Sequence, residues 1–250
     1  MASAAGSDGR IDIGSTLSRG FETIGRNFPA FLGLSVLLGG LPTFAFSYLT
    51  GENLSDDNIL AFTGGGAALG AWLVQTVATA FLHAIIVRSS ILTLSGRDAD
   101  IGGSLVAAVG LILPLVGLTI LTGLIVLIGL VLLIVPGIIA YVALSVAVPV
   151  MVEERRGVTE CMERSAALTK GSRWHVFLLL LILGVAYLVV AAALGAAMVA
   201  VGAETLQPAV EAAAVTVTSL FMSAMTAALY VELRTVKEGA TTEGLAAIFE

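Results

Sequence analysis

Polar side chains recur at helical spacing inside two long apolar stretches of this chain. Residues three and four positions apart share one face of an α-helix, so each set forms a polar stripe along an apolar helix. Hydroxyl, amide and imidazole groups donate and accept hydrogen bonds, and in an apolar surrounding the chemistry they offer is binding of a polar group. The first stripe contains Gln75, Thr76, Thr79 and His83, and the second contains Thr216, Ser219, Ser223, Thr226 and Tyr230.

Two interpretations of these stripes are open. In one, the stripes face each other and line a cavity or lateral groove for an amphiphile, such as a lipid with a polar headgroup. In the other, the hydroxyls are packing contacts between membrane helices, where each interhelical hydrogen bond contributes roughly 0.6 to 2 kcal/mol. Small residues four positions apart favour packing: Gly66 and Gly70 in one stretch, and Ser219, Ser223 and Ala227 in the other.

The sequence predicts no enzyme, cofactor or metal centre. It contains no HExxH, GxSxG or Walker motif, and its two histidines, His83 and His175, fall in different predicted helices. Proton relays and intramembrane hydrolases need ionisable groups deep in the membrane, and His83 is the single one predicted there. Cys161 has no second cysteine to pair with, and we interpret it as a structural residue.

Composition places the chain in a membrane. Hydrophobic residues make up 58% of it, charged residues 12%, and the mean hydropathy is +1.02, all outside the range of soluble globular domains. We predict an all-α fold, a polytopic bundle of six transmembrane helices. The net charge of −6, with acids and bases mixed in the same segments, gives no support to a nucleic-acid partner.

The predicted spans are uncharged runs of about 20 residues or more, the length that crosses roughly 30 Å of hydrocarbon. The stretch between Asp100 and Glu153 contains no charged residue and is too long for a single span. We predict two helices there with a turn near Gly129, and Pro136-Gly137 is a competing break. The six predicted spans are 28–48, 67–87 with an extension to residue 94, 105–128, 131–152, 174–201 and 208–232.

The Lys and Arg residues predict the orientation of the spans. All 12 of them lie before the first span or after the second, fourth and sixth spans. The short segments after the first and fifth spans carry acids alone. Because cytoplasmic loops of membrane proteins are enriched in Lys and Arg, both chain ends are predicted on the cytoplasmic side.

Two amphipathic segments are predicted to rest on the cytoplasmic face of the membrane. In the first, the cytoplasmic N-terminal segment 1–27, apolar side chains recur at helical spacing and would lie in the headgroup layer. The second, residues 158–171, has Glu160 in its first turn and stops at Lys170-Gly171. Their apolar faces comprise Ile13, Leu17, Phe21, Ile24 and Phe28 in the first, and Val158, Met162, Ala166 and Thr169 in the second.

Basic and aromatic residues mark the predicted membrane boundary, because both favour the headgroup layer. The six spans make up one transmembrane domain, residues 28–235, which a short cytoplasmic tail follows, residues 236–250. The boundary residues predicted on the cytoplasmic side are Arg19, Arg26, Arg164, Lys170, Arg173, Trp174 and Arg234.

Several short motifs are distributed along the chain: Arg26-Asn27-Phe28, Pro136-Gly137, Val152–Gly157, Ala166–Trp174, Leu229–Arg234 and Glu238-Gly239. Together they resemble one family of bacterial membrane proteins, the YciC-like and glycerophosphoryl diester phosphodiesterase membrane-domain proteins. The resemblance covers nearly the whole chain and implies a six-helix protein of the bacterial inner membrane. Some members are fused to a phosphodiesterase, whose catalytic His-Arg pair and clustered acids this chain lacks.

The functional expectation is a non-enzymatic membrane protein that binds, transports or organises lipids or lipid-linked metabolites in the bacterial envelope. Its expected partners are membrane lipids, along with other membrane proteins. Two alternatives remain open: a permease or channel for small solutes, and a scaffold that recruits partner membrane proteins through its apolar faces. Neither the ligand nor the oligomeric state follows from the sequence.

Overall fold

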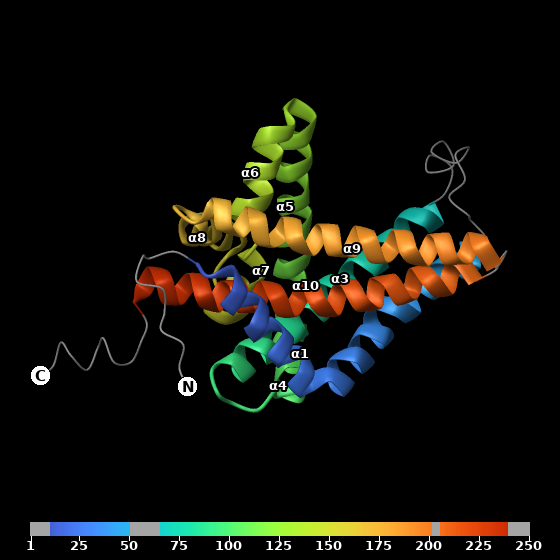
Figure 1. The fold of residues 1–250 in the computed structure, drawn as a ribbon, viewed down its shortest axis with the longest axis horizontal. Helices are drawn as coiled ribbons and strands as arrows, with labels where there is room; N and C mark the ends of the chain where they lie inside the picture. Colours follow the sequence, from blue (N-terminus) through green and yellow to red (C-terminus); the bar gives the residue numbers. More distant parts are fainter. Residues whose placement is uncertain (1–10, 51–65, 202–205, 240–250) are drawn as a thin grey trace, which may run out of the picture.

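The computed structural model describes residues 11–50, 66–201 and 206–239, and every regular element within them is a helix (Figure 1). Six helical stretches are long and apolar enough to cross a membrane. The predicted all-α class and the six long apolar helices are therefore confirmed. Most of the predicted tail, from residue 240 onward, lies outside the described residues.

The N-terminal stretch is a continuous helical path with a kink near residue 27. The Asp12 carboxylate begins it by accepting a hydrogen bond from the Gly14 amide at 2.9 Å. The predicted boundary between residues 27 and 28 is a kink, because Pro29 cannot donate to the helix ladder and Asn27 departs from helical dihedral angles. The path comprises α1 (Ile13–Ser35), the π-helical turn η1 (Val36–Gly40) and α2 (Leu41–Thr50).

Three long helices follow the longest dimension of the molecule. They are α3 (Gly66–Leu94), α9 (Arg173–Val201) and α10 (Gln207–Glu238). Leu82 and Ile86 of α3 share a buried cluster with Phe31 of α1 and with Leu220 and Met225 of α10. Helix α9 runs beside α10 (Figure 1), but its side chains are exposed all around over residues 184–190.

The side of α1 that packs on the protein is lined by small residues. Thr16 and Gly20 are buried, whereas Phe21 and Phe28 are exposed. The reason is close packing on α10: a Cβ atom at Gly20 would lie 2.4 Å from the sulfur of Met225. Small residues therefore face the protein, and the two phenylalanine rings face outward. The other predicted positions do pack against the core: Ile13, Leu17 and Ile24.

The uncharged stretch after Asp100 forms four helices where two were predicted. Its central turn falls at Leu133, in extended conformation (φ −163°, ψ 142°), between the two predicted breaks. Glycine allows the two arms to touch, because a Cβ atom at Gly129 would lie 2.8 Å from Gly137 Cα. The helices are α4 (Ile101–Val109), α5 (Ile112–Leu132), α6 (Ile134–Leu144) and α7 (Ala147–Glu154).

The α5–α6 hairpin does not run alongside the other long helices. Figure 1 shows it projecting across the direction of α9 and α10, with its base near α7 and α8. The buried residues of α5, Leu115 and Leu118, both lie in its first two turns. The half of α5 near the turn therefore packs on little besides α6.

Helix α8 (Val158–Thr169) is the second predicted amphipathic segment. It ends at Lys170, and Gly171 adopts φ +88°, a conformation that suits glycine. Its buried side includes Cys161 and Ser165 and is rotated from the predicted face. The cause is a hydrogen bond that Ser165 Oγ donates to the Ala143 carbonyl of α6 at 2.7 Å, which turns this side toward the protein.

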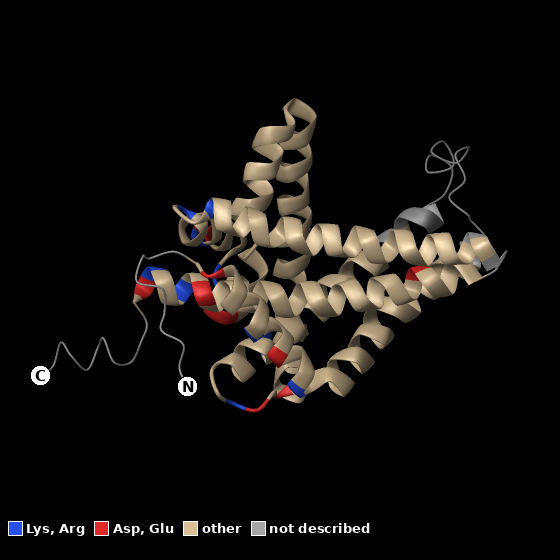
Figure 2. Cartoon of the chain, viewed as in Figure 1, with Lys and Arg blue, Asp and Glu red and all other residues tan. Residues whose placement is uncertain are grey.

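Charged side chains gather at one end of the long helices. Figure 2 shows them around α8, at the last turns of α10 and beside α1, whereas the α5–α6 hairpin and most of α9 are uncharged. Glu211 lies near the opposite end of α10. This separation matches the Lys and Arg distribution along the chain, since charges are excluded from the hydrocarbon and collect at its boundary.

Candidate functional site

The two predicted polar stripes meet between α3 and α10. The imidazole of His83 lies between two hydroxyls: its Nδ1 is 3.1 Å from Ser223 Oγ, and its Nε2 is 3.3 Å from Thr226 Oγ1. Ser223 and Thr226 are both buried. Both ring nitrogens therefore have partners within the protein, as the packing interpretation expects.

Several other side chains of the stripes also find partners inside the protein. Thr79 donates to the carbonyl oxygens of Gln75 and Thr76 at 2.8 and 3.1 Å, and Thr216 donates to a carbonyl one turn earlier in α10. The Gln75 amide donates to Thr43 Oγ1 of α2 at 2.8 Å. We call these contacts among α2, α3 and α10 the polar seam. The hydroxyl, imidazole and amide N–H groups named here are paired within the protein, which supports packing over ligand binding, whereas Gln75 Oε1 is buried without a hydrogen-bond partner among the described residues.

Glycines of η1 bring the N-terminal path against the polar seam. A Cβ atom at Gly40 would lie 2.5 Å from Thr216 Oγ1, and one at Gly39 would lie 3.7 Å from Ser219 Oγ. Gly70 was predicted to be a packing glycine. A Cβ atom added there would have no described atom within 4 Å. The adjacent pair Gly39-Gly40 was the sequence signal for this contact, but it does not follow the small-xxx-small spacing.

The seam continues toward the end of α10 that carries Glu211, through contacts that the sequence analysis did not predict. Ser47 Oγ of α2 donates to Glu211 of α10 at 3.1 Å, and the Gln207 amide donates to the same carboxylate at 3.0 Å. Thr43 and Ser47 are four positions apart and share a helical face. That spacing in the first predicted span is the signal that could have identified them.

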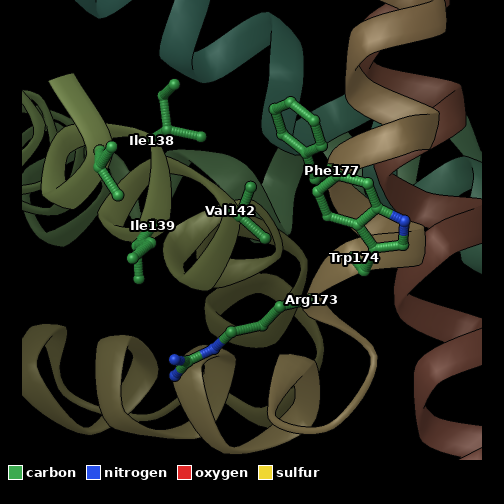
Figure 3. A pocket seen from close by; sticks show the side chains of 7 residues that line it. Ile138, Ile139, Val142, Arg173, Trp174 and Phe177 are labelled. Atoms are coloured by element: carbon green, nitrogen blue, oxygen red, sulfur yellow. The ribbon is translucent and has the colours of Figure 1, made fainter.

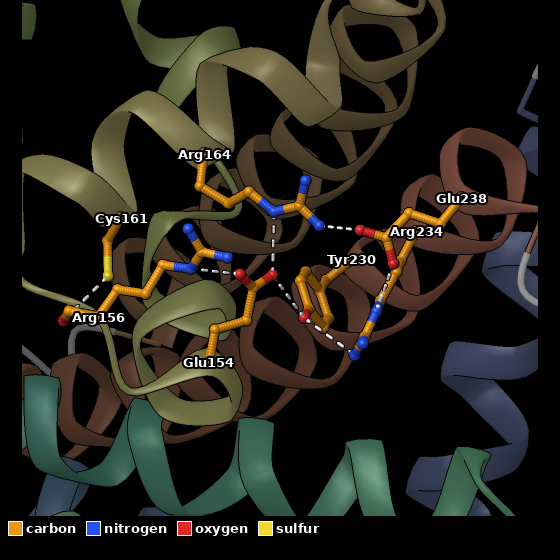
Figure 4. Close-up of polar contacts among 7 residues, drawn as sticks. All are labelled: Glu154, Arg156, Cys161, Arg164, Tyr230, Arg234 and Glu238. Atoms are coloured by element: carbon orange, nitrogen blue, oxygen red, sulfur yellow. Dashed lines mark hydrogen bonds and ion pairs between the residues drawn. The ribbon is translucent and has the colours of Figure 1, made fainter.

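Tyr230, the last residue of the second predicted stripe, belongs to a different site at the charged end. Its hydroxyl donates to Glu154 Oε1 at 3.2 Å (Figure 4). The Glu154 carboxylate also pairs with Arg156 Nε at 2.7 Å and with Arg164 Nε at 3.1 Å. Its side chain is 11% exposed. These partners compensate the carboxylate for the hydration that it loses on burial.

The ion pairs around Glu154 connect three helices, α7, α8 and α10, and we call them the Glu154 cluster. Arg164 reaches from Glu154 to Glu238, and Glu238 accepts from Arg234 Nε at 2.9 Å (Figure 4). Arg164 and Arg234 were predicted at the boundary, and their acidic partners were missed. Arg164 and Glu238 are 74 positions apart, so no local pattern predicts the pair.

The other predicted boundary residues divide by their contacts. Arg19 pairs with Glu232 at 2.9 Å and links α1 to α10. Arg26 and Lys170 are exposed. Arg173 and Trp174 lie together at the start of α9, next to a hollow on the surface.

That hollow is an apolar groove between α6 and α9 with a volume of about 230 Å³, here called the α6–α9 groove (Figure 3). The Trp174 ring stacks on Phe177 with ring centroids 5.4 Å apart. Figure 3 shows these rings across from the aliphatic side chains of α6, with Arg173 extending along one side. The lining residues are Val135, Ile138, Ile139, Val142, Arg173, Trp174 and Phe177.

Cys161 is buried in α8, and its reactivity can be predicted. Burial raises the pKa of its thiol to about 11, and the thiolate is the form that reacts with maleimides. At pH 7 to 8 the thiol is protonated and shielded, so we expect no labelling of the folded protein and complete labelling after denaturation in dodecyl sulfate. Rapid labelling of the folded protein at pH 7 would contradict both the burial and the raised pKa.

These features identify the chain as a multi-pass integral membrane protein. Its helices contact one another through the polar seam and through the Glu154 cluster of ion pairs. In the parts of the chain that the structure describes, no three His, Cys, Asp or Glu side chains group where they could hold a metal ion. No family model, curated protein or solved structure matches the chain. Its function must therefore be argued from its own residues.

Proposed function

We propose that this protein is a non-enzymatic lipid-binding protein of the bacterial inner membrane, with both chain ends in the cytoplasm, and that an anionic phospholipid occupies the α6–α9 groove. The observation that carries the proposal is the groove itself. It joins aliphatic walls to a guanidinium and an indole at the charged end of α9. The resemblance to the YciC-like family and the Lys and Arg distribution support the membrane and the orientation.

The residue types in the groove fit the two parts of a phospholipid. Ile138, Ile139 and Val142 provide an apolar wall for an acyl chain, which gains nothing from polar neighbours. Trp174 is 67% exposed, and an amphipathic indole favours the level of the headgroups. An acyl chain in the groove would thus have its headgroup near the start of α9.

Charge complementarity favours an anionic headgroup. Arg173 is exposed and makes no ion pair with any described residue, in contrast to Arg164 and Arg234. A guanidinium binds phosphate through paired, charge-assisted hydrogen bonds. The polar seam lacks these properties, because the residues that define it include no cation.

Removal of the Arg173 charge tests the proposal. A basic residue at a membrane surface contributes about 1 kcal/mol toward anionic lipid, or roughly a fivefold change in affinity. We therefore expect Arg173→Gln to bind phosphatidylglycerol roughly fivefold more weakly, and phosphatidylcholine unchanged. The measurement is native mass spectrometry of detergent-purified protein titrated with each lipid.

Arg97→Gln is the matched control, because Arg97 is exposed and lies outside the groove. This variant should retain the wild-type preference for phosphatidylglycerol. Trp174→Ala should weaken binding of both lipids, since it removes part of the apolar wall. Equal losses in Arg173→Gln and Arg97→Gln would mean that lipid binding reflects overall charge, and the groove would lose its assigned role.

A further inference from the structure

We infer that the α5–α6 hairpin does not cross the bilayer: it enters and leaves on the side of the charged end, and its turn contacts acyl chains of that leaflet. This inference is independent of the lipid proposed in the α6–α9 groove. It assigns the hairpin an interaction surface, residues 131–135, and one partner, lipid hydrocarbon. Four observations carry it.

The turn is aliphatic and exposed. Each of its five side chains has between 66% and 77% of its surface exposed, and none is polar. A turn that emerged on the far side would present this surface to water and headgroups, at a cost of about 25 cal/mol for each Å². The turn comprises Val131, Leu132, Leu133, Ile134 and Val135.

The residue at the break in the turn has both of its backbone groups paired within the hairpin. The Leu133 amide donates to the Gly129 carbonyl at 3.0 Å, and the Leu133 carbonyl accepts from the Gly137 amide at 3.4 Å. Pro136 has no amide hydrogen to satisfy. Irregular backbone is excluded from hydrocarbon chiefly because unpaired amide and carbonyl groups are costly there. Both the backbone amide and the backbone carbonyl of Leu133, where the helix breaks, are therefore hydrogen-bonded.

Both ends of α6 lie near the charged end of the molecule. At one end, Val135 lines the same groove as Arg173, the first residue of α9. At the other end, the Ala143 carbonyl accepts a hydrogen bond from Ser165 of α8, the helix that carries Arg164. A helix that crossed the membrane would hold its two ends on opposite faces.

Helix α6 alone is too short for a span, and the 21-residue candidate span Ile134–Glu154 is reached only by adding α7 beyond a break. The 11 residues of α6 reach about 17 Å at 1.5 Å per residue, short of roughly 30 Å of hydrocarbon. Beyond α6 the chain breaks at Ser145 and Val146 before α7 begins. Figure 1 shows the hairpin directed across α9 and α10, as expected if those two helices follow the membrane normal and the hairpin lies along the leaflet.

The test uses single cysteines in a full-length Cys161→Ala background. Leu133→Cys places the probe in the turn, and Leu206→Cys is the matched control, an exposed leucine where α10 begins at the opposite end of α9. Sealed cells and inverted vesicles are treated with a membrane-impermeant maleimide. We expect Leu206→Cys to label from one face, and Leu133→Cys to label from neither face until detergent is added.

Fluorescence quenching gives a second readout for the same variants. A bimane attached to the Leu133→Cys variant and reconstituted into vesicles should be quenched by lipids brominated on the acyl chain. Aqueous iodide should quench it at least fivefold less than it quenches bimane on the Leu206→Cys variant. Labelling of Leu133→Cys from the face that labels Leu206→Cys would show a full crossing. Labelling from the other face, or strong iodide quenching, would place the turn in water. Either outcome overturns the inference.

Discussion

Replacement of Gly137 by alanine should destabilise the protein, whereas the same replacement at Gly123 in the same hairpin should be neutral or stabilising. A Cβ atom at Gly137 would lie 2.6 Å from the Leu130 backbone nitrogen and 2.5 Å from Leu130 Cγ. The side chain of Leu130 can rotate away, but its backbone cannot move without parting α5 from α6. Overpacking against fixed atoms costs typically 1 to 3 kcal/mol, and we expect about 3 kcal/mol here.

Gly123 provides the matched control because a Cβ atom there meets no described atom within 4 Å. Alanine is favoured over glycine in a helix by about 0.5 to 1 kcal/mol, so Gly123→Ala should raise the melting temperature slightly. The measurement is thermal unfolding of purified protein in one detergent, followed by loss of monodisperse protein in size-exclusion chromatography. Equal melting temperatures for the two variants would mean that α5 and α6 are not held together at this contact.

Neutralising Glu154 should also cost stability. Glu154→Gln retains the side-chain volume but removes the charge that Arg156 and Arg164 share, and it leaves the two guanidinium groups to repel each other. Breaking a buried charge network by removal of one partner is costly, although Arg156 is half exposed and solvent screens its share. We expect a loss of about 2 kcal/mol, because a single hydrogen bond to a charged group contributes about 1.5 to 3 kcal/mol.

Glu153→Gln is the control for the Glu154 prediction. Glu153 is exposed, adjacent in sequence and absent from the ion pairs around Glu154. Surface substitutions of this kind usually change stability by less than about 0.5 kcal/mol. The melting temperatures of the two variants, compared in the same detergent at pH 7, decide the matter. A similar small shift of the melting temperature in both variants would mean that the Glu154 cluster contributes little to stability.

Most of the architecture could be predicted because it follows from short-range pattern. Long uncharged runs predict membrane helices, and the spacing of Ser223 and Thr226 predicts that they share one side of α10, the side on which both contact His83. The side of α1 that packs on α10 was not predicted. The apolar spacing grouped Phe21 and Phe28 on a face toward the membrane and left the packed side open. In a membrane the surroundings are as apolar as the core, so close packing selects small residues such as Gly20 for the contact with α10.

The sequence by itself determined that this is a multi-pass membrane protein of six long apolar helices with its charges separated to the helix ends, because hydrocarbon excludes charge and rewards runs of apolar side chains. Tertiary structure alone decided that the polar stripes close on each other, that Glu154 collects its arginines, and that the chain turns at Leu133. These outcomes depend on which helices that are distant in sequence pack closely against each other, as they do at Gly40 and Gly137. The order of residue types along the chain does not specify which helices will do so.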